Sequence, residues 1–218
     1  KSQGVDVHSF QNSDMAQAHA VALDSDGNVV TAGENAAGDT IVLAKYDSAG
    51  ELDAGFGDNG LATLAGMGAT AQDVLVLGDG SYLVAGSSNG DFLLARYSDS
   101  GVLDTGFDGD GVKTLDLGTT MDSLGGSPTT DHGYVVEVSD SGSDYVVAGI
   151  FNDGSNHLAL VGVDTASGSV DTNFGGSSTG VSDTLAVDAS AQVDLCLDDS
   201  GNFVVASTSG NDRSEEHT

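Results

Sequence analysis

The chain is dominated by an internal repeat. A segment that ends in an Ala-Gly pair at Gly33 returns at Gly86 and Gly149, so successive copies are offset by 53 and 63 residues. A fourth copy covers residues 195–206. Repeats of this length build folds in which each unit buries its apolar faces against its neighbours. We therefore expect an array of similar structural units.

Each unit holds four short apolar runs divided by turn residues. In the first unit these runs fall within residues 20–64, and Asp26-Gly27 separates the first two. Such a dipeptide, like Asp79-Gly80 in the second unit, favours a tight hairpin because glycine takes positive φ at little steric cost. None of the runs reaches the roughly ten residues that a helix needs, and glycine interrupts every unit. The runs are therefore predicted to be strands.

Four strands per unit at this period predict a β-propeller blade. A blade cannot bury both of its faces alone, so stacking against neighbouring blades must build the core. The alternatives are a β-solenoid, which would usually have a shorter period, and a string of small sandwiches, which need more strands per unit. We predict an all-β fold, a β-propeller of four-stranded antiparallel blades that is an incomplete fragment of a larger ring.

The repeat also sets the expected boundaries. Residues 1–212 form a single repeat region, in which residues 1–13 are expected to end a preceding unit. The later units are expected at residues 14–66, 67–118 and 119–188, followed by a partial unit at 189–212 that stops after its second strand. Because three units are whole and two are partial, a larger ring is expected. A closed ring of four blades is the alternative.

The last six residues do not continue the sequence pattern of the repeat. The segment from Arg213 to Thr218 reads Arg-Ser-Glu-Glu-His-Thr and resembles the translation of a short-read sequencing adapter. We therefore expect residues 213–218 to be a non-native tail. A natural polar tail is the alternative.

The copies share a specific pattern. It reads D-G-hydrophobic-A-G, then A-K/R-Y, then G-x-L-D-x-x-F-G, and it resembles the delta-60 repeat, a β-propeller repeat of bacterial proteins with no assigned activity. The match weakens in the third unit, where Gly162-Val163 replaces the basic-aromatic pair. The resemblance implies a large, multidomain bacterial protein that is secreted or attached to the cell surface, covalently continuous with further repeats or domains.

Residues that recur in every unit are expected to be structural. The recurring positions are Asp53, Phe56, Asp104, Phe107, Asp171, Phe174, Gly33, Gly86 and Gly149. Each aspartate is expected to accept backbone N–H bonds in a turn, beside a phenylalanine wedged between blades. A repeated ligand site is the alternative. Lys45 and Arg96 could pair with the first two aspartates, but Asp171 recurs without a basic partner, which favours the turn.

Calcium is the one cofactor that the turns bring into consideration. Asp24 with Asp26, and Asp108 with Asp110, place carboxylates two residues apart beside glycine, as calcium loops do. Neither pair continues to a full EF-hand loop, and the equivalent turns lose one carboxylate. Hairpin turn chemistry is therefore the favoured interpretation, with no cofactor and no catalytic residue expected.

Two other potential ligands receive structural interpretations. Cys196 lies in a strand-like run and is expected to be a small buried thiol. His19 is aligned with Asp73 and Tyr134 of the later units and is interpreted as a tolerated surface residue.

The charge balance limits the partners. The chain has 34 Asp and Glu against 5 Lys and Arg, a formal net charge of −29. Nucleic acids and anionic membrane surfaces reward clustered Lys and Arg, so neither is an expected partner. The acids are spread over the turns of every repeat rather than gathered in one block. Such an acidic composition suits a secreted protein.

Three functions remain open at this point. The first is a non-enzymatic scaffold of a secreted or surface bacterial protein that binds a protein or glycan. The second is a propeller enzyme acting on glycans, a hydrolase or lyase, and the third is a calcium-stabilised adhesin module. An enzyme should show one unit that departs from the others, and the third unit does so with Asp131, His132 and an insert at 125–128. That insert is interpreted first as a longer loop, so the scaffold is preferred.

Overall fold

The fold is described by a computed structural model. The described residues are 17–117, 132–139, 141–152, 156–176, 179–187, 191–209 and 212–217. The expected opening segment at residues 1–13, the insert at 125–128 and Asp131 lie outside them. The side chain of His132 is likewise not described.

The chain forms four antiparallel sheets in sequence order, each a meander in which consecutive strands pair. The first sheet contains β1 (Gln17–Leu23), β2 (Val29–Glu34), β3 (Ile41–Tyr46) and β4 (Leu61–Leu64). The second contains β5 (Ala69–Val76), β6 (Tyr82–Ser88), β7 (Asp91–Tyr97) and β8 (Val112–Leu115). The third contains β9 (His132–Val138), β10 (Asp144–Asn152), β11 (Asn156–Asp164) and β12 (Val181–Ala186), with a 3₁₀ turn η2 (Phe174–Gly176) before β12. The fourth contains β13 (Val193–Leu197), β14 (Phe203–Ser209) and β15 (Asp212–His217).

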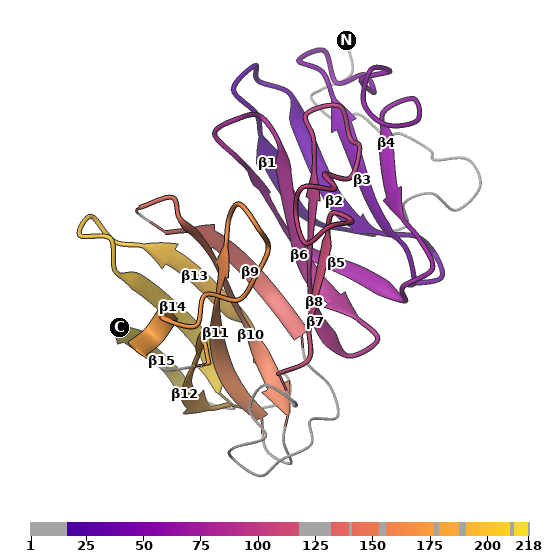
Figure 1. Ribbon diagram of the computed structural model, residues 1–218. Helices are drawn as coiled ribbons and strands as arrows, with labels where there is room; N and C mark the ends of the chain where they lie inside the picture. Colours follow the sequence, from indigo (N-terminus) through magenta and orange to yellow (C-terminus); the bar gives the residue numbers. More distant parts are fainter. Residues whose placement is uncertain are drawn as a thin grey trace.

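Successive sheets pack face to face like the blades of a propeller (Figure 1). The first strand of each sheet is the innermost: β5 contacts β1 and β2, β9 contacts β5 and β6, and β13 contacts β9 and β10. The prediction of an all-β propeller built from four-stranded antiparallel blades is therefore confirmed.

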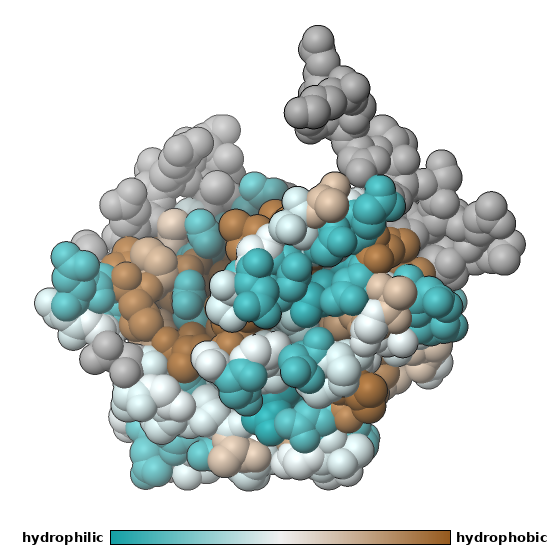
Figure 2. All heavy atoms as spheres, turned by 90° about the horizontal axis from the view of Figure 1, so that it is seen from above, coloured by the Kyte–Doolittle hydropathy of each residue, from teal (hydrophilic) through white to brown (hydrophobic). Residues whose placement is uncertain are grey.

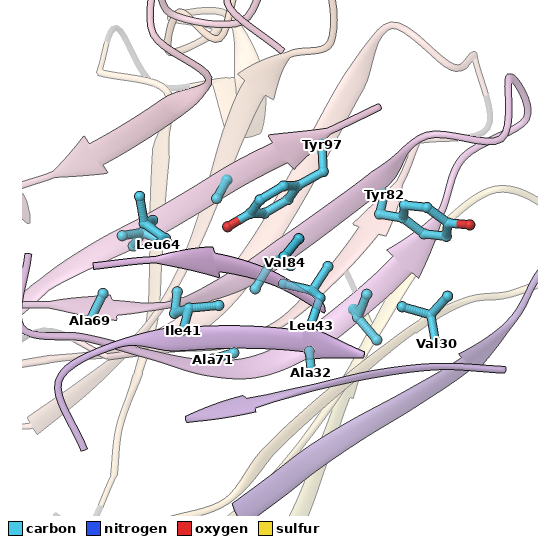
Figure 3. Packing of buried hydrophobic residues seen from close by; sticks show 14 of the residues in the cluster. Val30, Ala32, Ile41, Leu43, Leu64, Ala69, Ala71, Tyr82, Val84 and Tyr97 are labelled. Carbon is cyan, nitrogen blue, oxygen red and sulfur yellow. The ribbon is translucent and has the colours of Figure 1, made fainter. Parts of the chain in front are cut away.

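The core lies between the sheets. One cluster joins the first and second sheets, a second joins the second and third, and a third joins the third and fourth. In the first cluster, Ile41 and Leu43 of β3 meet Val84 of β6 and the ring of Tyr97 from β7 (Figure 3). The face shown in Figure 2 carries hydrophilic and weakly polar residues over much of its area, with brown apolar patches among them.

The hairpin turns form as the glycines predict. Gly27 and Gly80 have φ values of 82° and 85°, a region that residues with a Cβ seldom adopt. The N–H of Gly27 reaches the carbonyl of Asp24, and the N–H of Gly80 reaches that of Leu77, at 3.1 and 2.9 Å. These local turns fix the pairing of the first two strands of each blade.

The registers correct one alignment between units. In β1 the pairing slips between Ala18 and Ala20, and in β5 it slips between Ala71 and Asp73. Each slip is a β-bulge that leaves one extra residue on the innermost strand. His19 is that residue in β1, so it corresponds to Gln72. The alignment of His19 with Asp73 was wrong by one position.

The fourth sheet differs from expectation in two respects. The unit was expected to stop after its second strand, but β15 pairs with β14 from Ser209 opposite Asp212 to Val204 opposite His217. The backbone of the suspected tail thus occupies the third-strand position. The expectation of a buried Cys196 was wrong: its thiol is exposed because it points away from the third sheet.

Candidate functional site

The signature aspartates make the same contact in three units. Oδ1 of Asp53 accepts the N–H of Gly55 at 2.9 Å, and Oδ1 of Asp104 accepts the N–H of Gly106 at 2.9 Å. In the third unit, Oδ1 of Asp171 accepts the N–H of a residue two positions on, Asn173, at 3.0 Å. Each carboxylate therefore closes its own turn, as Asx turns do.

The phenylalanine that follows each aspartate reaches the next sheet. Phe56 meets Tyr82 edge-on with ring centroids 5.6 Å apart, and Phe107 meets Tyr145 at 6.0 Å. Both phenylalanines are buried, with exposed fractions of 1% and 0%. Phe174 makes the corresponding contact with Phe203 of the fourth sheet at 6.1 Å. The rings therefore join consecutive blades.

The basic residues of the first two units reinforce the same junctions. Lys45 Nζ lies 3.2 Å from Asp24 and 3.9 Å from Asp53, over the ring of Tyr82 in the next sheet. Nε of Arg96 donates a hydrogen bond to Oδ2 of Asp104 at 2.8 Å.

Arg96 also makes a direct bond across the second junction. Its Nη1 donates to the carbonyl of Thr165 in the next unit at 2.6 Å, and its guanidinium lies 5.2 Å from the ring centroid of Phe107. The N–H of Gly106 and the Arg96 guanidinium hold the pKa of Asp104 below its ordinary value.

The third unit lacks the basic residue because a ring takes its place. Gly162 has the backbone contacts of Arg96: Asp171 donates its N–H to the Gly162 carbonyl as Asp104 does to that of Arg96. A Cβ at Gly162 would lie 2.5 Å from Cβ of Phe174. No side chain fits there without moving the aromatic ring.

The recurring glycines of the second strands are structural as well. A Cβ at Gly33 would lie 1.8 Å from the carbonyl oxygen of Gln17, and one at Gly86 would lie 1.9 Å from that of Thr70. Both glycines pair beside the bulge of the innermost strand. In the third unit, Gly149 pairs with Gly133 at the corresponding bulge.

Carboxylates that were considered as calcium ligands accept hydrogen bonds or form ion pairs within the protein. Asp24 accepts the N–H of Asp26 at 3.0 Å and the N–H and side-chain amide of Asn28 at 2.8 Å, beside Lys45. These hydrogen bonds hold the pKa of Asp24 below its ordinary value although burial opposes them.

In the second pair, Asp108 meets Lys113 at 3.2 Å and Asp110 accepts the N–H of Val112 at 2.9 Å. Within the described residues, no group of three or more histidine, cysteine or acidic side chains is arranged to hold a metal. A calcium site therefore stays a prediction from the sequence.

Three acids on the innermost strands form a cluster that the repeat pattern did not reveal. They are Asp73 on β5, Glu137 on β9 and Asp194 on β13. Burial raises the pKa of Asp73 and of Glu137. The charge of Asp194 raises both further, and that of Asp73 also raises the pKa of Glu137. The available signal was an acid within an apolar strand: Asp73 and Asp194 share a position at which the other two units carry Ala20 and Val135.

A comparison with protein families supports the fold. A model described as a domain of unknown function (DUF5122) beta-propeller matches residues 77–107. This stretch includes the second signature turn with Asp104 and Phe107. The short match supports a bacterial β-propeller repeat. No curated protein matches the chain in sequence.

Solved structures of similar fold include a bifunctional GH43-CE of Bacteroides eggerthii, with a TM-score of 0.51 and 11% identity over 90% of this chain and 23% of that one. A protein from Lactobacillus plantarum has a TM-score of 0.50 and 18% identity over 91% of this chain and 55% of that one. A catalytically inactive virginiamycin B lyase from Staphylococcus aureus has a TM-score of 0.45 and 12% identity, over 94% and 57%. The chain thus spans between about a quarter and three fifths of these proteins.

In the described part of the chain, no helix has the length and apolar character needed to cross a membrane.

Proposed function

We propose that the chain is a non-enzymatic propeller scaffold of a secreted or surface bacterial protein, and that it binds a protein or glycan. The observation that carries this proposal is the use made of the repeat signature. Its aspartates close turns, its phenylalanines join neighbouring sheets, and Arg96 bonds across a junction to Thr165. The recurring residues are thus committed to stability, which leaves binding to positions that differ between units.

Two of the innermost acids supply such positions. Glu137 and Asp194 come from different sheets, and the charge of Asp194 acts on Glu137. Carboxylates accept hydrogen bonds from the hydroxyl groups of a sugar and attract basic side chains. The net charge of −29 repels polyanions. We therefore favour a neutral glycan or a basic protein segment as the ligand.

The cellular setting rests on the motif pattern. The pattern that ends in Asp104 and Phe107 supports a delta-60 repeat, and proteins with that repeat are often large and secreted. The acidic composition agrees with an extracellular or surface location. Further covalently attached repeats or domains form part of the same proposal.

Binding is tested by screening the purified chain against neutral oligosaccharides and basic peptides, with calcium and with a chelator. We expect a hit whose dissociation constant rises about tenfold in Glu137→Gln, because a charged acceptor is lost. Glu51→Gln is the matched control, since Glu51 is an exposed acid in the connector between β3 and β4 and does not belong to an innermost strand. Loss of binding in both variants, or in neither, would contradict the proposed site.

One observation favours the enzymatic alternative. Burial raises the pKa of Glu137 above its ordinary value, which is the direction that a general acid requires. A structurally similar protein is named a bifunctional GH43-CE, although the likeness concerns the fold. Turnover of any bound glycan, lost in Glu137→Gln, would replace the scaffold by a hydrolase or lyase.

A further inference from the structure

The chain contains two Asn-Gly pairs, Asn59-Gly60 and Asn89-Gly90. In such a pair the backbone nitrogen of the glycine can attack the carboxamide of the asparagine, because glycine has no Cβ to shield its nitrogen. Asparagine is accordingly one of the thermolabile residues of proteins. The two pairs start from a similar backbone, since Asn59 and Asn89 have φ values of 53° and 51°. A difference in their reactivity must therefore come from their surroundings.

The first pair is held by hydrogen bonds on both sides of its glycine. The N–H of Gly60 donates to the carbonyl of Phe56 at 2.8 Å, and the carbonyl of Gly60 accepts the N–H of Lys45 at 3.0 Å. Gly60 is also buried. The side-chain amide of Asn59 is held as well, because its Nδ2 donates to Oδ1 of Asp58 at 2.6 Å. The nitrogen that would attack is thus directed at a carbonyl and cannot turn without breaking these contacts.

The second pair forms the two-residue turn between β6 and β7, closed by the pairing of Ser88 with Asp91. Asn-Gly is a preferred dipeptide of such turns. Asn89 is exposed, and the N–H of Gly90 makes no hydrogen bond to another described residue. The N–H of Asn89 lies 3.5 Å from the carbonyl of Gly68, which is longer than an ordinary hydrogen bond. The attacking nitrogen of this pair is therefore available.

We propose that Asn89 is a site of spontaneous deamidation from which Asn59 is protected, and that the charge gained at residue 89 weakens the β6–β7 hairpin. The nitrogen of Gly90 forms a bond to Cγ of Asn89. The carbon–nitrogen bond of the carboxamide breaks, and its nitrogen leaves as ammonia with the proton of the Gly90 N–H. Water then opens the cyclic imide at either of its two carbonyl groups. One opening yields aspartate, and the other yields isoaspartate, in which the main chain runs through the former side chain.

Both products place a carboxylate where acids already lie close together. Asp91, two residues on, is partly buried, and burial and the charge of Asp116 raise its pKa. A further negative charge disfavours the ionised form of Asp91 still more. Isoaspartate also lengthens the backbone of the turn, next to Ser88, whose Oγ donates to the carbonyl of Met67 at 2.6 Å. That bond links the turn to the connector between the first and second sheets.

The two rates are compared by incubating the purified chain at mildly alkaline pH and analysing its peptides by mass spectrometry. We expect the amide of Asn89 to convert to acid at least about fivefold faster than that of Asn59, because a hydrogen bond of Gly60 must break first. Both sites are measured in the same sample, so Asn59 is the matched control. Equal rates, faster conversion of Asn59, or no conversion at either site would overturn the proposal.

The same incubation in urea separates the fold from the local sequence. Both asparagines precede glycine, so their rates should become similar once the chain is unfolded. A preference for Asn89 that persists in urea would assign the difference to the neighbouring residues, and would also overturn the proposed protection of Asn59.

The effect of the added charge is measured with Asn89→Asp, which reproduces one of the two products. Its melting temperature should lie below that of the wild type at about pH 7 and approach it near about pH 3, where carboxyl groups are protonated. The same substitution should cost less in an Asp91→Asn background, because one of the repelling charges is gone. A melting temperature that Asn89→Asp leaves unchanged at about pH 7 would contradict the weakening of the hairpin.

Discussion

The carboxylate of Asp73 accepts the backbone N–H of Val136, 63 residues further along the chain, with 3.0 Å between Oδ2 and N. Its other oxygen binds the N–H of Val74 in its own sheet at 2.8 Å. One side chain thus satisfies a backbone donor on each side of a sheet junction. Buried donors need such partners, which explains why an acid is kept in a place where burial opposes its charge.

Asp73 should give the stability of the fold a specific pH dependence. Burial raises its pKa above the ordinary value of 3.8, so the folded state binds its proton more tightly than the unfolded state. The contribution of this group to stability is therefore greatest below that value and falls as pH rises through the folded pKa. Asp73→Asn removes this dependence. As pH rises from about 4 to about 7, the wild type should lose stability that the variant keeps. The melting temperature of the variant should therefore rise relative to that of the wild type over this range. A difference that decreases over this range would contradict the assignment.

Asp53 should stabilise its turn through hydrogen bonding rather than charge. Asp53→Ala removes the acceptor of the Gly55 N–H and should lower the free energy of unfolding by about 1 kcal/mol. Asp53→Asn retains Oδ1 as an acceptor and removes only the charge. It should lose about half of that free energy or less, because an ion pair with Lys45 at 3.9 Å contributes little. Urea denaturation measures both values. Equal losses in the two variants would assign the effect to the ion pair instead.

Arg96 should contribute more to stability than an ordinary surface ion pair. Arg96→Met removes the bonds to Asp104 and to the Thr165 carbonyl and the contact with Phe107, and should cost about 2 kcal/mol. Arg96→Lys should recover only part of this, because one ammonium group does not reproduce the guanidinium fork. Lys113→Met is the control. It breaks the exposed pair with Asp108 and should cost no more than about 0.5 kcal/mol. A similar loss in Arg96→Met and Lys113→Met would contradict a bond across the junction.

The sequence was sufficient to predict the blades and a phenylalanine between them, but not the polar bonds that cross from one blade to the next. Turns such as Asp26-Gly27 and the lengths of the apolar runs are local, so the repeat revealed strands and hairpins directly. The bonds from Arg96 to Thr165 and from Asp73 to Val136 span 69 and 63 residues, and no local pattern encodes such pairs.

The registers resolve the remaining misalignment and part of the missed cluster. β1 and β5 carry their bulges at the same place, so the 53-residue offset between Gly33 and Gly86 holds along both strands and matches His19 to Gln72, not to Asp73. With the registers known, Asp73 and Asp194 occupy the same position. From the sequence alone, that equivalence is hidden among the 34 acids of the chain.

The hydroxyl group of Tyr97 should be dispensable. Tyr97 is 1% exposed between the first and second sheets, and its oxygen has no hydrogen-bond partner among the described residues. Figure 3 shows the ring within the apolar cluster. Burial raises the pKa of Tyr97 well above its ordinary value. Tyr97→Phe removes an unsatisfied polar group and should leave stability unchanged or raise it by about 1 kcal/mol. A clear drop in melting temperature would reveal a partner for the hydroxyl group.

Gly162 and Phe174 should be coupled. A Cβ at residue 162 would lie 2.5 Å from Cβ of Phe174, so Gly162→Ala must displace the ring and should cost about 1 to 3 kcal/mol. Phe174→Ala removes the contact with Phe203 and should also destabilise. Once the ring is gone, however, the added methyl group has space. The double variant should therefore lose little more than Phe174→Ala alone, a non-additivity that a double-mutant cycle measures. Gly78→Ala is the matched control, because a Cβ there meets no atom within 4 Å, and it should change stability by no more than about 0.5 kcal/mol. Additive losses at residues 162 and 174 would show that the ring does not occupy the place of the missing basic side chain.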